Sequence, residues 1–212
     1  MDATYTTKAI ILRREPYHEN DARVAIYTRD FGKLVLVARG ARKLSSKLAS
    51  HLEPLNVCDI MVVKGRQYDY VGSCVSEEVF FGLKNDYDTS LLGGNTAALV
   101  DYAIKGAEPD GRIFLMLEKF LTTLNAAAGK ASFRRLQTLQ SAFCLKFVSL
   151  LGYRPRLDDL RVGNITVSRS AAAAAVQTLA MKFSEVLELE LADSVAREFT
   201  GAVSGYARYV FD

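Results

Sequence analysis

The chain has 212 residues, of which 50% are hydrophobic and 24% are charged, and its formal net charge is +3. This composition is typical of a folded protein with a hydrophobic core, and no apolar run approaches the roughly 18 residues of a transmembrane helix. Three widely spaced cysteines, Cys58, Cys74 and Cys144, exclude a disulfide framework and a four-thiolate zinc site. We expect buried thiols, no secretory signal, and a cytoplasmic, nucleoid-associated protein.

Residues 1–82 have the pattern of a small β-barrel. The segment 22–29 alternates apolar and polar residues, as a half-buried strand does, and Gly32 can adopt the positive φ that a short hairpin turn needs. Five short strands are expected, at residues 4–14, 22–29, 34–38, 52–63 and 68–75. Five such strands predict an oligonucleotide/oligosaccharide-binding (OB) fold.

From about Asp86, apolar residues recur at helical spacing. Ser132 is placed to cap one helix, and Gly152 is placed to end it. Helices are expected at residues 95–105, 110–128, 133–151, 170–182, 183–192 and 193–211, with an irregular segment at about 153–169. We therefore predict an α+β multidomain protein, with a five-stranded OB-fold barrel at residues 1–82 and an all-α helical domain at residues 83–212.

The positive charge is concentrated in residues 29–47, which hold six cations and one acid. Arg39, Arg42, Lys43 and Lys47 alternate there with small residues, so that side chains, hydroxyls and backbone amides could all reach phosphates. Candidates to stack on bases in the same domain are Tyr5, Tyr17, Tyr27, Phe31, Tyr68 and Tyr70. The alternative interpretation is an ordinary solvated charged surface.

The chain has no recognisable catalytic motif. His18 and His51 lack metal-ligand spacing, and neither a GxSxG sequence nor a P-loop occurs. The sequence therefore predicts a protein without enzymatic activity, with no metal and no cofactor.

Two segments resemble the bacterial RecO family of recombination mediators. The first segment, residues 8–56, carries Leu12, Arg13, Tyr17, Glu19, Asn20, Asp21, Thr28, Gly32, Lys33, Gly40, Arg42, Lys43, Ser46, Lys47, Leu52, Pro54 and Leu55. The second segment, residues 143–157, carries Gly152, Tyr153, Pro155 and Leu157. The two segments lie in different predicted domains and follow the order of the family.

The resemblance implies a mediator of DNA repair and homologous recombination that performs no catalysis. Such a protein binds single- and double-stranded DNA and anneals complementary strands. With RecR, it helps to load RecA onto single strands coated with single-strand-binding protein (SSB). The implied DNA-binding residues are Arg39, Arg42, Lys43, Lys47, Lys33 and Arg13.

The resemblance also implies that the SSB C-terminal tail docks on the helical domain. That tail is acidic and ends in an aromatic residue, so it needs an apolar pocket rimmed by cations. Ala142 stands where family members often carry arginine. The candidates for this site are Phe143, Lys146, Phe147, Arg134 and Arg135, although Phe143 and Phe147 could equally be core residues.

Many members of the family carry a four-cysteine zinc module after the segment that corresponds to residues 155–157. Leu160 and Gly163 stand where thiolates would be expected, so the chain resembles the zinc-free branch. Two other functions stay open. One is an OB-fold adaptor that binds proteins without direct nucleic-acid binding, and the other is an RNA-binding OB protein that would prefer ribonucleotides.

Overall fold

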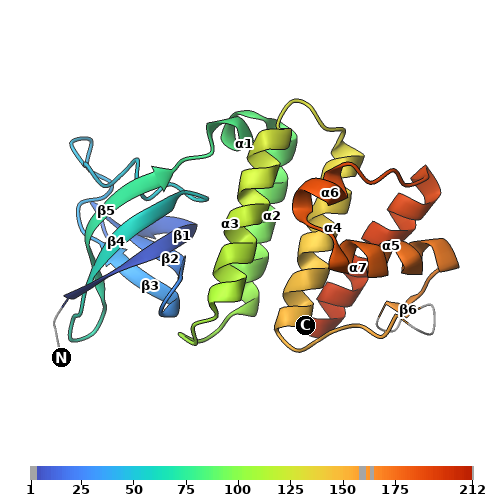
Figure 1. Ribbon diagram of the computed structural model, residues 1–212. Coiled ribbons are helices and arrows are strands. Elements are labelled where there is room, and N and C mark those ends of the chain that lie inside the picture. Colours follow the sequence, from blue (N-terminus) through green and yellow to red (C-terminus); the bar gives the residue numbers. More distant parts are fainter. Residues whose placement is uncertain (1–3, 158–160, 163–164, 212) are drawn as a thin grey trace. The chain divides into compact units, whose positions relative to one another are not determined.

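The computed structural model describes residues 4–157, 161–162 and 165–211. Five strands close into a barrel, shown in blue to teal in Figure 1: β1 (Thr4–Tyr17), β2 (Asp21–Thr28), β3 (Gly32–Ala38), β4 (Val57–Val63) and β5 (Tyr70–Glu78). Their order is β1-β2-β3-β5-β4, and β4 pairs back to β1. Neighbouring strands are antiparallel except β3 and β5, which run parallel and pair at Val37 and Tyr70. The predicted OB-like fold is confirmed.

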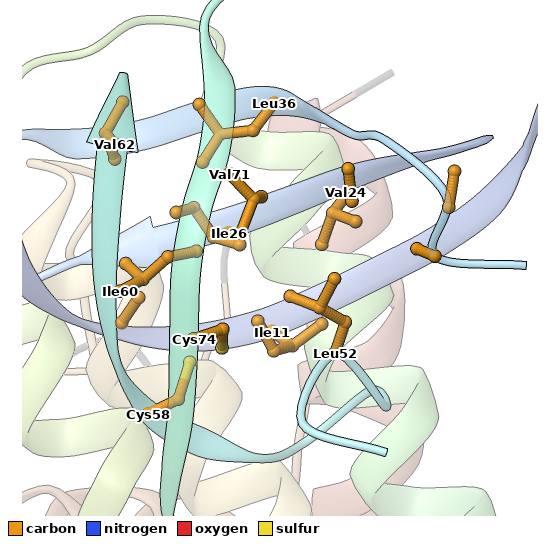
Figure 2. Close-up of a cluster of buried hydrophobic side chains, with 14 residues drawn as sticks. Ile11, Val24, Ile26, Leu36, Leu52, Cys58, Ile60, Val62, Val71 and Cys74 are labelled. Atoms are coloured by element: carbon orange, nitrogen blue, oxygen red, sulfur yellow. The ribbon is translucent and has the colours of Figure 1, made fainter. Parts of the chain in front are cut away.

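The inward-facing side chains of the strands form one apolar core (Figure 2). Alternation along β2 places Val24 and Ile26 inside, where both are fully buried. Cys58 and Cys74 belong to this core, and hydrogen bonding between the two thiols together with burial raises the pKa of Cys58. Burial raises the pKa of Cys144 to about 12. All three thiols are free and buried, so the prediction that they act as small hydrophobic residues is confirmed.

The turn between β2 and β3 requires glycine. Gly32 has a φ of +67°, and a Cβ atom there would lie 2.5 Å from the carbonyl oxygen of Glu108. The fourth strand begins at Val57 and not at Leu52 as predicted, because Leu55 has a φ of 71° and leaves the β region.

The helices are α1 (Phe81–Asn85), α2 (Tyr87–Ala103), α3 (Gly111–Ala127), α4 (Phe133–Leu150), α5 (Arg169–Ala180), α6 (Phe183–Leu187) and α7 (Asp193–Phe211). Two sequence expectations were wrong here, because α1 was not predicted and α2 begins at Tyr87 and not at Asn95. The start of α2 is fixed by Asp86, whose carboxylate accepts a hydrogen bond from the Thr89 amide at 3.0 Å. Gly93 and Gly94 have low helix propensity, so the sequence showed no sign of a helix that begins before them. The cap at Asp86 helps the helix to form in spite of the two glycines.

The described residues form two compact units. One comprises residues up to 81 together with 93–121, and the other comprises residues 82–92 and those from 122 onward. In the second unit, α4 packs against α5, α6 and α7. Ser132 caps α4 by accepting from the Arg135 amide, as predicted.

The segment after α4 contains a short two-stranded ladder, β6 (Arg161–Val162) and β7 (Ile165–Thr166). Val162 is fully buried, and Gly205 on α7 leaves room for Ile165, because a Cβ there would lie 2.5 Å from Ile165 Cδ1. Packing therefore holds the described part of this segment in place. Leu160 and Gly163, where thiolates were considered, lie outside the described residues.

Candidate nucleic-acid interface

The long connection between β3 and β4 carries the predicted basic loop, and Arg14 of β1 fixes its base. Arg14 Nη2 donates to the Ala41 carbonyl at 3.0 Å, and Nη1 donates to the Ala49 carbonyl at 2.9 Å. The same Nη1 lies 2.7 Å from Glu53 Oε1. One guanidinium thus holds both ends of residues 41–49. Arg14 was not among the predicted site residues, although strand alternation puts it on the opposite face from Arg13.

The start of the loop is tied to the turn between β1 and β2. The Gly40 amide donates to Asp21 Oδ1 at 2.8 Å, and Gly40 has a φ of +66°. The Arg42 amide donates to the Asn20 carbonyl at 2.9 Å, and its Nη1 donates to the His18 and Glu19 carbonyls at 3.1 Å each. Arg42 therefore positions the loop as well as contributing charge.

Arg39, Arg42, Lys43 and Lys47 are all exposed. None of these four cations forms an ion pair with any residue that the structure describes. The acids bonded within this region, Asp21 and Glu53, bind the Gly40 amide and Arg14. The loop therefore presents positive charge without ion-pair partners among the described residues, and such charge can neutralise phosphates and release their counterions.

An aromatic groove of about 350 Å³ adjoins the loop through Arg39. The Arg39 guanidinium stacks over the Tyr70 ring at 4.1 Å, and Arg23 stacks over Tyr17 at 4.6 Å. The rings of Tyr17 and Tyr68 lie 6.2 Å apart, edge to face. The lining residues are Tyr17, His18, Asp21, Val37, Arg39, Gln67, Tyr68 and Tyr70. Arginine and tyrosine faces of this kind provide stacking surfaces for single-stranded bases.

The six stacking candidates from the sequence separate into three groups. Tyr17, Tyr68 and Tyr70 line the groove. Tyr5 and Phe31 pair with each other at 4.3 Å, with Lys64 above the Tyr5 ring. Tyr27 is fully buried and donates to the Asp110 carbonyl at 3.2 Å, so it is unavailable for stacking. The sequence did not point to Gln67, which reaches the groove through a turn, or to Arg23, whose position over the Tyr17 ring depends on strand pairing.

Replacing Tyr68 by alanine should lower the affinity for a single-stranded oligonucleotide about tenfold, because one base–aromatic stack contributes roughly 1–3 kcal/mol. Tyr68→Phe should bind almost as the wild type, since it keeps the ring. Tyr87→Ala is a matched control, because Tyr87 is exposed on α2 and belongs to the other unit. Anisotropy titration measures all three variants, and equal losses for Tyr68→Ala and Tyr87→Ala would exclude the groove.

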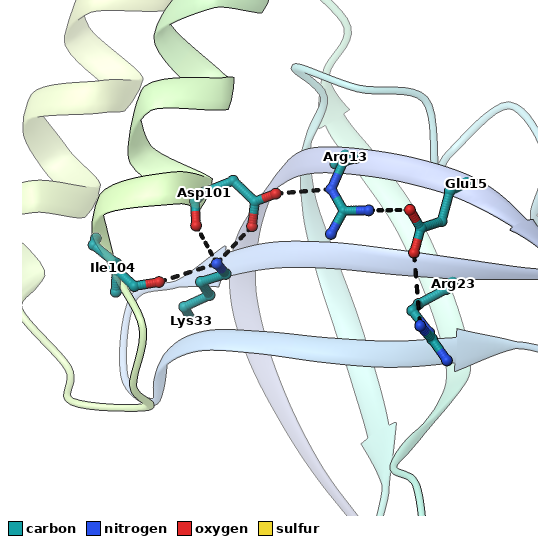
Figure 3. A network of polar contacts seen from close by, with 6 residues as sticks. All are labelled: Arg13, Glu15, Arg23, Lys33, Asp101 and Ile104. Atoms are coloured by element: carbon teal, nitrogen blue, oxygen red, sulfur yellow. Dashed lines mark hydrogen bonds and ion pairs between the residues drawn. The ribbon is translucent and has the colours of Figure 1, made fainter. Parts of the chain in front are cut away.

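Arg13 and Lys33, the other two DNA-binding candidates, are bonded to Asp101 of α2 (Figure 3). Arg13 Nε lies 2.8 Å from Asp101 Oδ2, and Lys33 Nζ lies 2.6 Å from Oδ1 and 3.0 Å from the Ile104 carbonyl. Arg13 also pairs with Glu15. Since the side chain of Lys33 is only 14% exposed, binding a phosphate would require breaking these bonds. Their role in DNA binding stays a prediction, and we leave both residues out of the candidate site.

In the second unit, called the helical unit below, Phe143 and Phe147 are fully buried and stack on each other with ring centres 5.8 Å apart. Both are core residues of this structure, as one of the two interpretations held. Lys146 donates to the Leu179 carbonyl at 2.6 Å. Burial lowers the pKa of Lys146. None of these three side chains therefore forms an open apolar pocket here.

The remaining candidates, Arg134 and Arg135, are exposed but paired. Arg134 pairs with Asp193, and Arg135 lies 3.5 Å from Glu190. Both acids follow α6 in the acidic and apolar segment 188–193. The chain's own carboxylates therefore occupy the cations that an acidic tail would use.

Removing the carboxylates of Asp193 and Glu190 tests whether they compete with an acidic peptide for Arg134 and Arg135. Asp193→Asn combined with Glu190→Gln should raise the affinity for an acidic peptide ending in phenylalanine roughly fivefold, because each exposed pair contributes at most about 1 kcal/mol. Anisotropy of the labelled peptide measures the change. Glu188→Gln is the control, since Glu188 is exposed in the same segment. An unchanged or lower affinity in the double variant would exclude Arg134 and Arg135 from such a site.

Among the residues that the structure describes, no group of three or more His, Cys, Asp or Glu side chains could hold a metal ion. His51 Nδ1 accepts a hydrogen bond from the Ser76 amide at 3.1 Å, so this ring nitrogen is bonded to the backbone of β5. The described helices include none that is long and apolar enough to cross a membrane.

Comparisons with known proteins match both parts of the chain. The family model described as recombination protein O N terminal matches residues 1–80, and the one described as recombination protein O C terminal matches residues 84–164.

Curated relatives named DNA repair protein RecO include those of Rubrobacter xylanophilus, 33% identical over 156 residues, and Syntrophus aciditrophicus, 31% identical over 159 residues. Each of these matches covers 74% of this chain, and they cover 60% and 59% of the relatives. The protein of Roseiflexus sp. is 35% identical over 156 residues, or 53% of its length. The chain therefore spans somewhat more than half the length of these relatives.

Proposed function

The chain belongs to the recombination protein O (RecO) family, and from this premise we propose that it acts in DNA repair and recombination by binding single- and double-stranded DNA. The observation that carries the proposal is the loop of four exposed cations, none with an ion-pair partner among the described residues, beside a groove of three tyrosines. Phosphates would contact Arg39, Arg42, Lys43 and Lys47, and bases would stack in the groove.

The proposed activity has no covalent step. Cations on the loop would displace counterions from the phosphates, so binding should weaken steeply with added salt. Two strands that share one cationic surface repel each other less, which permits complementary strands to anneal. The helical unit would recruit partner proteins, with SSB contacted through its acidic tail. Joint action with RecR to load RecA is part of the same proposal.

Strand annealing tests the proposal directly. We expect the full chain to accelerate pairing of complementary labelled oligonucleotides, both bare and coated with SSB. Deleting the SSB tail should remove acceleration on coated strands and leave it on bare strands. A protein that binds neither form of DNA would instead fit the adaptor function. A clear preference for the matching ribo-oligonucleotides would identify an RNA-binding protein.

A further inference from the structure

Leu44 lies at the tip of the basic loop with its side chain entirely in water. Its relative exposure is 109%, the highest of any large hydrophobic residue in the described part of the chain. Other exposed apolar side chains, such as Leu115 on α3 at 45%, keep part of their surface covered. An apolar side chain with its whole surface in water gains most from being buried by a ligand.

The tip is held out by a fixed loop. Leu44 and Ser45 are the central residues of a turn closed by the hydrogen bond from the Ser46 amide to the Lys43 carbonyl, at 2.9 Å. The preceding turn is closed from the Lys43 amide to the Gly40 carbonyl at 3.1 Å. Arg14 and Arg42 anchor the base of the loop, as described above. The exposure of Leu44 thus follows from the geometry of the loop.

The surroundings of Leu44 restrict what can bury it. Lys43 and Lys47 flank the tip, and both are exposed cations without an ion pair among the described residues. A ligand must therefore offer negative charge on its outside and an apolar interior within the reach of one side chain. Stacked bases behind a phosphate backbone have this combination, and leucine is one of the residues that enter base steps as a wedge.

We infer that Leu44 is such a wedge, entering between neighbouring bases and unstacking them while Lys43 and Lys47 hold the phosphates on either side. This inference rests on the proposed function, since it assigns a role to the same loop. Unstacked bases expose the edges that pair with a complementary strand. An anionic lipid surface is the rival ligand, because it also combines negative charge with an apolar interior.

The test uses oligonucleotides, single-stranded and duplex, that carry 2-aminopurine, whose fluorescence rises when the base is unstacked. Saturating wild-type chain should raise the signal severalfold. Leu44→Ser should abolish the rise and change the binding constant by no more than about threefold, because the cost of unstacking a base step offsets most of the gain from burying the leucine. The salt slope should not change, because the phosphate contacts remain. Leu44→Met should restore the rise, since methionine keeps an apolar side chain of similar reach. Leu115→Ser, on the surface of α3, is the matched control and should behave as wild type.

The outcomes separate the two proposals. Salt-dependent binding without any fluorescence rise in the wild type would overturn the wedge alone. A rise that persists in Leu44→Ser would also overturn it. If the wild type shows no salt-dependent binding at all, the DNA-binding function fails and the wedge fails with it. Co-sedimentation of the wild type with phosphatidylglycerol vesicles that is lost in Leu44→Ser would assign the residue to a membrane surface.

Discussion

Asp101→Asn should destabilise the unit that contains the barrel by roughly 3 kcal/mol, because it removes a largely buried carboxylate that bonds the largely buried Lys33 ammonium and the Arg13 guanidinium at once. Lys33 and Asp101 are 14% and 13% exposed, and Arg13 bonds the second oxygen of the same carboxylate (Figure 3). The asparagine would leave the Lys33 ammonium facing a neutral amide. Hydrogen exchange should show faster opening of β3 and of residues 93–103.

The effect should depend on pH. Burial favours the neutral form of Asp101, but hydrogen bonds from Lys33 and Arg13 outweigh it and hold the pKa of Asp101 below its usual value. A lowered pKa in the folded state gives stability that is present above the unfolded pKa, about 3.9, and that is lost as the pH falls through the folded pKa. The difference between wild type and Asp101→Asn should therefore be full at pH 7 and shrink below about pH 4.

Asp59→Asn is a suitable control, because Asp59 is exposed on β4 of the same unit. Its effect should stay within about 0.5 kcal/mol. Equal protection of β3 amides in wild type and Asp101→Asn would show that the carboxylate contributes little to the stability of the unit.

The second large effect is expected from reversing two loop charges. Lys43→Glu combined with Lys47→Glu should lower the affinity for a single-stranded oligonucleotide roughly hundredfold near 0.1 M salt, because each change removes a phosphate contact and adds repulsion. The described contacts of both lysine side chains include no ion pair, so the far-ultraviolet circular dichroism and the unfolding midpoint should not change. Arg42 is a poorer choice, because its guanidinium also holds the His18 and Glu19 carbonyls.

The matched control is Lys130→Glu combined with Lys182→Glu, two exposed lysines of the other unit with the same change in net charge. We expect less than a threefold loss, since only long-range attraction is weakened. Equal losses for the two pairs would show that net charge, and not the loop, governs binding.

The barrel could be predicted because each signal was local. Alternation along residues 22–29, the glycine at position 32 and the run of short strands each act within a few residues. The start of α2 was missed because Gly93 and Gly94 lower helix propensity, while the cap at Asp86 depends on a side chain whose hydrogen bond the pattern does not show.

The site was predictable only in part. The four loop cations could be read from their clustering, but Arg14 and Arg23 could not be assigned, because strand register decides which carbonyl or ring each guanidinium meets. Asp101 is 68 residues beyond Lys33 in the sequence, so its bonds to Lys33 and Arg13 needed the tertiary fold. The pairing of Arg134 with Asp193 is equally non-local.

The most direct test of the account is a salt titration of wild-type binding to a labelled single strand. If the four loop cations displace counterions from phosphates, log affinity should fall linearly with log salt with a slope of roughly −3, from four contacts at about 0.7 each. The Lys43→Glu, Lys47→Glu variant should bring that slope to about −1.4 or flatter. A wild-type slope near zero, or a slope unchanged in the variant, would contradict phosphate binding by the loop.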